Sequence, residues 1–137
     1  MTYLFDTSAL AKRYLIEDGR EQVVALFAQA DEIGVGSFWF AEVISAFCRL
    51  RRENNLTKQE YERIKSEVLE DFEDFSIVSI TTATNEKAAE LLEGNIQRGM
   101  DALHVACAIV WYADVFVSGD HRQVLAAKHA GLNVIEV

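Results

Sequence analysis

The feature that most constrains the fold is a regular alternation of short apolar segments with longer amphipathic ones. The short segments are typical of strands, and the longer ones repeat their apolar residues with the period of a helix. We expect strands at residues 2–5, 32–37, 76–81, 115–118 and 133–137. Strands separated by helices need crossover connections, so the pattern predicts a mostly parallel sheet. We therefore expect an α/β fold, a three-layer α/β/α sandwich of about five strands that forms a single domain over residues 1–137.

The helical segments are expected at residues 11–18, 20–30, 38–54, 84–96, 101–113 and 121–131, with one more beginning at residue 57. Thr57 and Glu60 form a capping-box pattern, which marks the start of that helix. The helix at 101–113 is apolar on nearly all sides, which is typical of a helix inside a protein. An acidic residue, Asp101, stands at its start.

The composition favours a well-packed globular protein. Half of the 137 residues are hydrophobic, and a chain of this length buries roughly two-thirds of its surface on folding. No apolar run reaches the ~18 residues of a membrane helix, and the first residues lack a basic leader, so we expect a cytoplasmic protein. The net charge of −9 argues against binding nucleic acid by overall positive charge. It does not exclude a metal-dependent enzyme acting on nucleic acid, because bound cations reverse the local charge.

Four acidic residues fall at corresponding places along the chain. Asp6 directly follows the first strand, and Asp120 follows the fourth. Asp101 opens the helix that leads into the fourth strand, and Glu42 lies one turn into the helix after the second. Ligands of open parallel sheets bind beyond the carboxyl ends of the strands. We therefore expect the four carboxylates to meet at this edge.

Each acid also has a simpler explanation. Asp6 can start a turn, Glu42 can face solvent, and Asp101 can complement the helix dipole. Asp120 can cap its helix, with Gln123 as the capping-box partner. These explanations do not account for the edge that all four acids share.

Four converging carboxylates need a counter-charge. Two ionised carboxylates about 5 Å apart repel by about 3 kcal/mol at an effective dielectric constant of ~20. Oxygen ligands without cysteine or histidine favour Mg²⁺ or Mn²⁺ over zinc. His104, one turn after Asp101, is better explained as a hydrogen-bonded core residue than as a catalytic group. Such a metal site suits the hydrolysis of a phosphodiester by an activated water, and no phosphate-binding glycine loop offers a competing explanation.

Four motifs along the chain resemble the PIN-domain family, and most closely its VapC-type toxins of toxin–antitoxin pairs. They are "YLFDTSAL", "AEV", "RGMDALHVACA" and "VFVSGD", and the resemblance covers nearly the whole chain. It implies a PIN-like fold and a Mg²⁺- or Mn²⁺-dependent endoribonuclease. It also implies a cognate antitoxin that blocks the acidic site, and a homodimer.

The resemblance assigns roles to the four acids. Asp6 and Asp101 would ligate the metal directly. Glu42 would bind it directly or through a water and orient the attacking hydroxide, and Asp120 would complete the metal site. Supporting hydroxyl groups are expected from Thr7, Ser8 and Ser118.

An acidic protein needs local cations to contact RNA phosphates. The candidates are Arg49, Arg51 and Arg52 at one helix end, and Arg98 just before Asp101. The alternative is that these arginines form a solvated helix end favoured by the helix dipole.

Two other functions stay open. One is a non-catalytic PIN-like module that binds RNA or a protein. The other is a small-molecule phosphatase, which would turn over phosphomonoesters.

Overall fold

The computed structural model describes residues 1–137 and contains one five-stranded sheet. The strands are β1 (Thr2–Phe5), β2 (Glu32–Gly36), β3 (Ser76–Val78), β4 (Val115–Ser118) and β5 (Val134–Glu136). Their order is β3-β2-β1-β4-β5, and every neighbouring pair is parallel. The predicted α/β class is thus confirmed, with a sheet that is wholly rather than mostly parallel.

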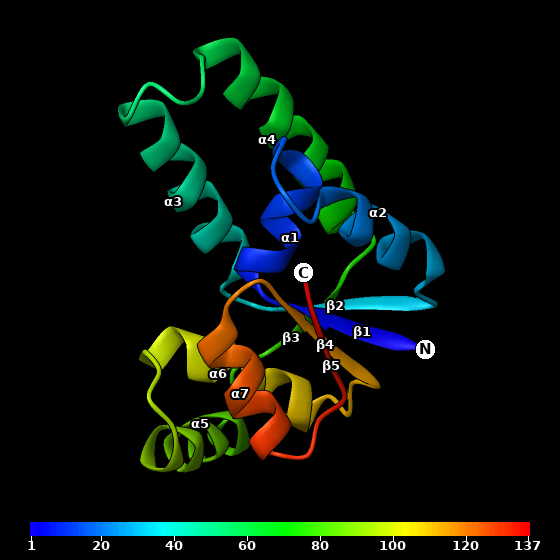
Figure 1. Cartoon of the computed structure of the whole chain (residues 1–137), viewed down its shortest axis with the longest axis vertical. Coiled ribbons are helices and arrows are strands. Elements are labelled where there is room, and N and C mark those ends of the chain that lie inside the picture. The colour runs from blue at the N-terminus through cyan, green and yellow to red at the C-terminus, as the bar shows by residue number, and fades with distance from the viewer.

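Seven helices cover the two faces of the sheet (Figure 1). Four lie on one face: α1 (Thr7–Tyr14), α2 (Arg20–Gln29), α3 (Trp39–Arg52) and α4 (Lys58–Glu73). Three lie on the other: α5 (Thr82–Gly94), α6 (Gly99–Val110) and α7 (His121–His129). This is the expected three-layer arrangement. None of the helices is long and apolar enough to cross a membrane.

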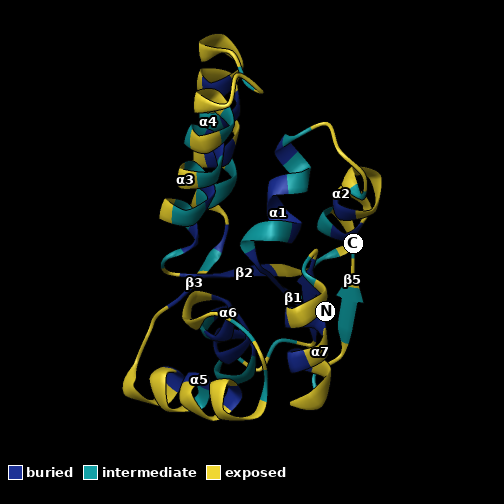
Figure 2. Ribbon diagram, turned by 60° about the vertical axis from the view of Figure 1, so that its left-hand side comes forward, coloured by how far each residue is buried: buried dark blue, intermediate teal, exposed yellow.

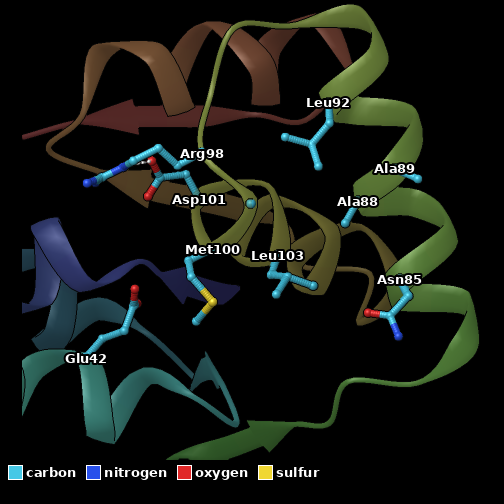
Figure 3. Close-up of a pocket in the computed structure, with 10 residues that line it drawn as sticks. Glu42, Asn85, Ala88, Ala89, Leu92, Arg98, Met100, Asp101 and Leu103 are labelled. Atoms are coloured by element: carbon cyan, nitrogen blue, oxygen red, sulfur yellow. Dashed lines mark hydrogen bonds and ion pairs between the residues drawn. The ribbon is translucent and has the colours of Figure 1, made fainter.

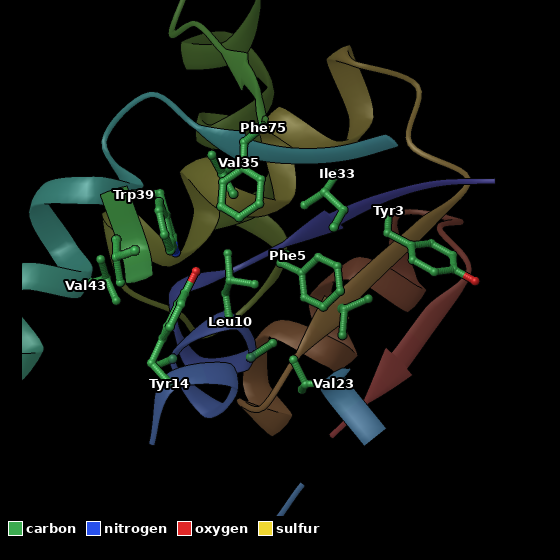
Figure 4. Close-up of a cluster of buried hydrophobic side chains, with 14 of the residues drawn as sticks. Tyr3, Phe5, Leu10, Tyr14, Val23, Ile33, Val35, Trp39, Val43 and Phe75 are labelled. Carbon is green, nitrogen blue, oxygen red and sulfur yellow. The ribbon is translucent and has the colours of Figure 1, made fainter. Parts of the chain in front are cut away.

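The side chains of a strand alternate between its two faces, and this alternation builds two cores. On β1, Tyr3 and Phe5 join the core beneath α1–α4 (Figure 4), whereas Leu4 joins the core against α5–α7. In Figure 2 the buried residues follow the sheet and the inner sides of the helices, while the α3–α4 hairpin extends away from the sheet. Trp39, at the base of that hairpin, is fully buried.

Side-chain caps explain where several predicted boundaries were wrong. Helix α1 begins at Thr7 rather than at residue 11, because the Asp6 side chain accepts the backbone N–H of Ala9 and caps the helix. Strand β3 ends at Val78 rather than at residue 81, because Thr81 forms a capping box with Thr84 and starts α5. The predicted capping box at Thr57 is confirmed.

The strand order predicts where on the sheet a ligand crevice forms. From β1 the chain passes outward to β2 and then β3, and it later returns to the other side of β1 as β4. The connections therefore change direction between β1 and β4, which is where open parallel sheets form a ligand crevice at their carboxyl ends. Asp6 directly follows β1, and Asp120 follows β4 by two residues.

Candidate active site

A cleft of about 800 Å³ lies at this crevice. Glu42 of α3, Asp101 of α6 and Asp120 before α7 line it, together with Thr7 and Ser8 of α1. Asp6 lies behind Ser8, is fully buried, and is hydrogen-bonded to it. Three segments far apart in the sequence thus bring their acids to the cleft, whereas Asp6 is buried beneath it and does not line it.

Asp6 is held by three donors. Ser8 Oγ and the Ala9 N–H donate to Oδ1 over 2.7 and 2.9 Å, and Ser118 Oγ donates to Oδ2. Complete burial raises the pKa of Asp6 above its ordinary value, against the opposing effects of His104 and of these hydrogen bonds. The carboxylate therefore has a fixed position, and its charge is poorly solvated.

Glu42 is held on one oxygen. Thr7 Oγ1 donates to Oε1 over 2.6 Å, and His104 Nε2 lies 2.5 Å from the same atom. Partial burial by itself would raise the pKa of Glu42, but the hydrogen bonds from His104 and Thr7 and the attraction of His104 and Arg98 outweigh it and lower the pKa. Glu42 is therefore ionised over the physiological pH range.

Asp101 is paired with a cation and an amide. Arg98 Nε lies 3.0 Å from Oδ2, and Gln123 Nε2 donates to Oδ1 over 3.3 Å. The Asp101 side chain is 12% exposed, whereas that of Arg98 is 82% exposed. Ion pairs with so exposed a partner contribute little net stability, so Arg98 can leave Asp101 at small cost. Figure 3 shows the side chains of Arg98 and Asp101 in contact.

Asp120 has the structural role that was weighed as its simpler explanation. Its side chain accepts the N–H of Arg122 over 2.9 Å and caps α7. The capping box with Gln123 does not form, because Gln123 directs its amide to Asp101 instead. Asp120 still lines the cleft, so capping and a functional role are compatible. The hydroxyls of Thr7, Ser8 and Ser118 each contact one of the acids or its backbone.

The donor set of the cleft suits a hard divalent cation, because every acidic group offers carboxylate oxygens. In this conformation, no three His, Cys, Asp or Glu side chains are arranged closely enough to hold a metal ion. One oxygen of Asp101 is instead bound by Arg98, and one oxygen of Glu42 by His104. A cation would compete with the exposed Arg98 for Asp101.

Two of the four arginines predicted to contact RNA line the cleft, namely Arg49 and Arg98. The other two do not. Arg51 lies over the ring of Tyr61, 5.3 Å from its centroid, and Arg52 is exposed at the end of α3. Helical periodicity explains Arg51, because positions two apart face opposite sides of a helix, whereas Arg52 is the last residue of α3.

Sequence reasoning missed Lys12, which also lines the cleft and approaches Gly119 so closely that a Cβ there would lie 2.9 Å from Lys12 Cε. Lys12 follows Ser8 by four residues on α1, so the two share one helix face. The spacing of four residues between Ser8 and Lys12 could have identified Lys12 from the sequence.

A second pocket of about 620 Å³ adjoins the acidic cleft and shares Glu42, Arg98, Met100 and Asp101 with it. Its far wall is formed by α5, with Asn85, Ala88, Ala89 and Leu92 (Figure 3).

Residues 3–129 match the model of the PIN domain family. The chain is a PIN domain. This match over nearly the whole chain confirms the resemblance to the PIN-domain family that the four motifs indicated.

Two curated relatives are ribonucleases by name. Ribonuclease VapC45 of Mycobacterium tuberculosis strain CDC 1551 is 29% identical over 109 residues, which cover 77% of this PIN domain and 73% of the relative. Ribonuclease VapC49 of strain H37Rv gives the same values.

Solved structures share the fold of this PIN domain at low sequence identity. FitAcB from Neisseria gonorrhoeae superposes with a TM-score of 0.75 at 15% identity, covering 98% of this chain and 96% of that one. VapBC2 from Rickettsia felis, bound to a promoter DNA fragment, gives 0.70 at 18% identity and covers 100% and 99%. VapC20 from M. tuberculosis, a toxin that cleaves the sarcin–ricin loop, gives 0.70 at 16% identity and covers 98% of both chains.

Proposed function

We propose that this PIN domain is a Mg²⁺- or Mn²⁺-dependent endoribonuclease and the toxin of a toxin–antitoxin pair. The observation that carries the proposal is a cleft at the carboxyl edge of the sheet that is lined by Glu42, Asp101 and Asp120. The fourth acid, Asp6, is buried and hydrogen-bonded to Ser8 of the cleft wall. The ribonucleases among its relatives agree with this activity.

The surroundings of the acids suggest a different role for each of them. Asp6 and Asp101 would hold the metal, since one is fixed by three donors and the other is bound only by an exposed arginine and a glutamine amide. Glu42, which stays ionised, would accept a proton from the attacking water. A bound divalent cation supplies charge stabilisation at the phosphodiester and lowers the pKa of water.

The cations around the cleft would hold the RNA backbone. Lys12, Arg49 and Arg98 line the same cleft as the acids. They would place a phosphate beside the carboxylates, although the protein as a whole carries a charge of −9. Contacts of this kind position a nucleic acid without reading its sequence.

An antitoxin is the proposed protein partner, in line with the toxin–antitoxin complexes among the structural neighbours. A homodimer and a cytoplasmic location belong to the same proposal. Size-exclusion chromatography with light scattering would measure the mass of the free chain in solution, and a monomer at all concentrations would contradict the dimer.

The test is an RNA cleavage assay with antitoxin-free protein, structured RNA and Mg²⁺, with and without a chelator. We expect cleavage that the chelator abolishes and that excess Mg²⁺ restores. Asp101→Asn is the most informative variant, because Asp6 and Asp120 also cap helices and their loss would disturb the fold. Cleavage that survives the chelator would contradict the metal mechanism, and a folded Asp101→Asn variant as active as wild type would contradict the role of Asp101.

The same assay separates the two other functions. A non-catalytic module would bind the RNA and leave it intact with Mg²⁺ present. A phosphatase would hydrolyse a phosphomonoester such as p-nitrophenyl phosphate and leave RNA uncut.

A further inference from the structure

One buried histidine contacts Glu42, one of the acids that line the cleft. His104 of α6 is 1% exposed, and its Nε2 lies 2.5 Å from Glu42 Oε1. Thr7 Oγ1 donates to the same oxygen and lies 3.3 Å from His104 Nε2. Residues from α1, α3 and α6 therefore meet at a single carboxylate oxygen.

The contact with Glu42 indicates which ring nitrogen of His104 carries the hydrogen. An ionised carboxylate only accepts hydrogen bonds, so His104 Nε2 carries the hydrogen that faces Glu42. The ring is fixed from another side by Phe38, whose ring centroid lies 4.6 Å away at an angle of 56°. His104 thus presents one donor in one orientation.

The other ring nitrogen of His104 makes no hydrogen bond that would stabilise the fold. His104 Nδ1 is buried and has no hydrogen-bond partner. A buried polar atom without a partner is unfavourable, and such atoms are rare in folded proteins. Violations of this kind are expected at functional sites, and the only polar contacts of this ring are those to Glu42 and Thr7.

We infer that His104 is a positioning residue that, with Thr7, holds Glu42 by Oε1 and leaves Oε2 for a ligand in the cleft. No side chain binds Oε2, whereas Oε1 has two partners within 2.6 Å. The inference rests on the proposed ribonuclease function, because the ligand of Oε2 would be the divalent cation or the attacking water. Mutation of residues that orient a metal-binding side chain typically lowers metal affinity or activity by about 10- to 100-fold.

The test compares His104→Leu, which removes the donor and keeps the bulk, with His104→Gln, which keeps an N–H donor. His129→Leu is the matched control, because His129 is exposed on α7 and lies outside the cleft. The measured quantities are kcat and KM for RNA cleavage, and Mn²⁺ affinity by electron paramagnetic resonance. Circular dichroism shows whether each variant is folded.

For His104→Leu we expect a fall in kcat and in Mn²⁺ affinity of about 10- to 100-fold, with KM for RNA unchanged because the cations of the cleft are untouched. His104→Gln recovers part of both losses, and His129→Leu behaves as wild type. In the Glu42→Gln background, His104→Leu has no additional effect, since two residues acting through one contact are not additive.

A folded His104→Leu variant with wild-type kcat and Mn²⁺ affinity would overturn the inference. So would full additivity with Glu42→Gln, which is the signature of a purely structural histidine. If His104→Leu does not fold, His104→Gln and its double variant with Glu42→Gln carry the same comparison. If wild-type protein does not cleave RNA at all, the proposed function fails, and the Mn²⁺ affinities still decide the role of His104.

Discussion

Replacing Asp6 in two different ways separates its structural role from its charge. Asp6→Asn keeps an oxygen that can accept the N–H of Ala9 and the hydroxyl of Ser8, whereas Asp6→Ala removes both acceptors. Both variants remove the buried negative charge, so the desolvation of that charge cancels in the comparison. The difference in stability between the two variants therefore reports the acceptor oxygen that Asp6→Asn keeps, together with the packing of the amide group that Asp6→Ala removes.

The magnitude follows from the partners that Asp6→Ala leaves behind. Loss of the helix cap costs about 1 kcal/mol, with a range of about 0.5–2. Ser8 also loses the acceptor of its hydroxyl group, a hydrogen bond with a net contribution of about 0.5–1.5 kcal/mol. Ser118 loses its close acceptor in both variants, because the NH₂ group of asparagine that replaces Oδ2 cannot accept a hydrogen bond. We expect the free energy of unfolding of Asp6→Ala to be about 1–3 kcal/mol below that of Asp6→Asn.

Urea denaturation in the presence of a chelator, followed by circular dichroism, measures this difference without a contribution from bound metal. Both variants are expected to lose RNA cleavage, because neither keeps the carboxylate. If the two variants unfold within about 0.5 kcal/mol of each other, Asp6 is not held as the structure describes, and the argument for a preformed ligand position collapses.

Three further predictions address charge and burial. With a chelator present, the free energy of unfolding of wild type relative to that of Asp6→Asn is expected to fall as the pH rises above the ordinary aspartate pKa of about 3.9. The reason is that burial raises the pKa of Asp6 in the folded state, so that ionisation of Asp6 opposes folding. Urea denaturation at several pH values measures this, and a rise with pH would contradict it. Arg49→Gln and Lys12→Gln are each expected to weaken RNA binding. Each is also expected to reduce the magnitude of the slope of the logarithm of the RNA association constant against the logarithm of the salt concentration by about 0.7. Arg52→Gln is the control outside the cleft, and equal effects of all three variants would mean that the cleft does not bind the RNA backbone. Cys107 is expected to resist iodoacetamide in the folded protein, because burial raises the pKa of its thiol to about 11; mass spectrometry after timed alkylation measures this, and rapid modification of Cys107 under native conditions would contradict its burial.

The fold followed from the sequence because its signals are periodic. Each of the five strands was located, and the alternation with helices predicted their parallel arrangement. The errors were at boundaries, where a single side chain decides. Asp6 starts α1 four residues early by capping it, and Thr81 ends the extended segment after β3 by capping α5.

The partners of the candidate site were harder to predict than its acids. The position of Asp6, Glu42, Asp101 and Asp120 relative to the strands indicated one edge, but which donor each acid meets depends on tertiary packing. The alternative explanation of Asp120 made Gln123 its capping-box partner, and Gln123 instead donates to Asp101.

His104 was interpreted as a core histidine, and it is one by burial. Its contact with Glu42 joins residues 62 positions apart, which no local pattern reveals. Arg51 and Arg52 were grouped with Arg49 by sequence, although only Arg49 faces the cleft.

The central claim is that these carboxylates act together on one divalent cation. Crystals grown with Mn²⁺ and measured at the manganese absorption edge test it directly, because the anomalous signal locates the ion independently of the protein. We expect a single strong peak in the cleft, in contact with Asp6 and Asp101, with Arg98 displaced from Asp101. A cleft without such a peak at saturating Mn²⁺, with Arg98 still bound to Asp101, would contradict the account.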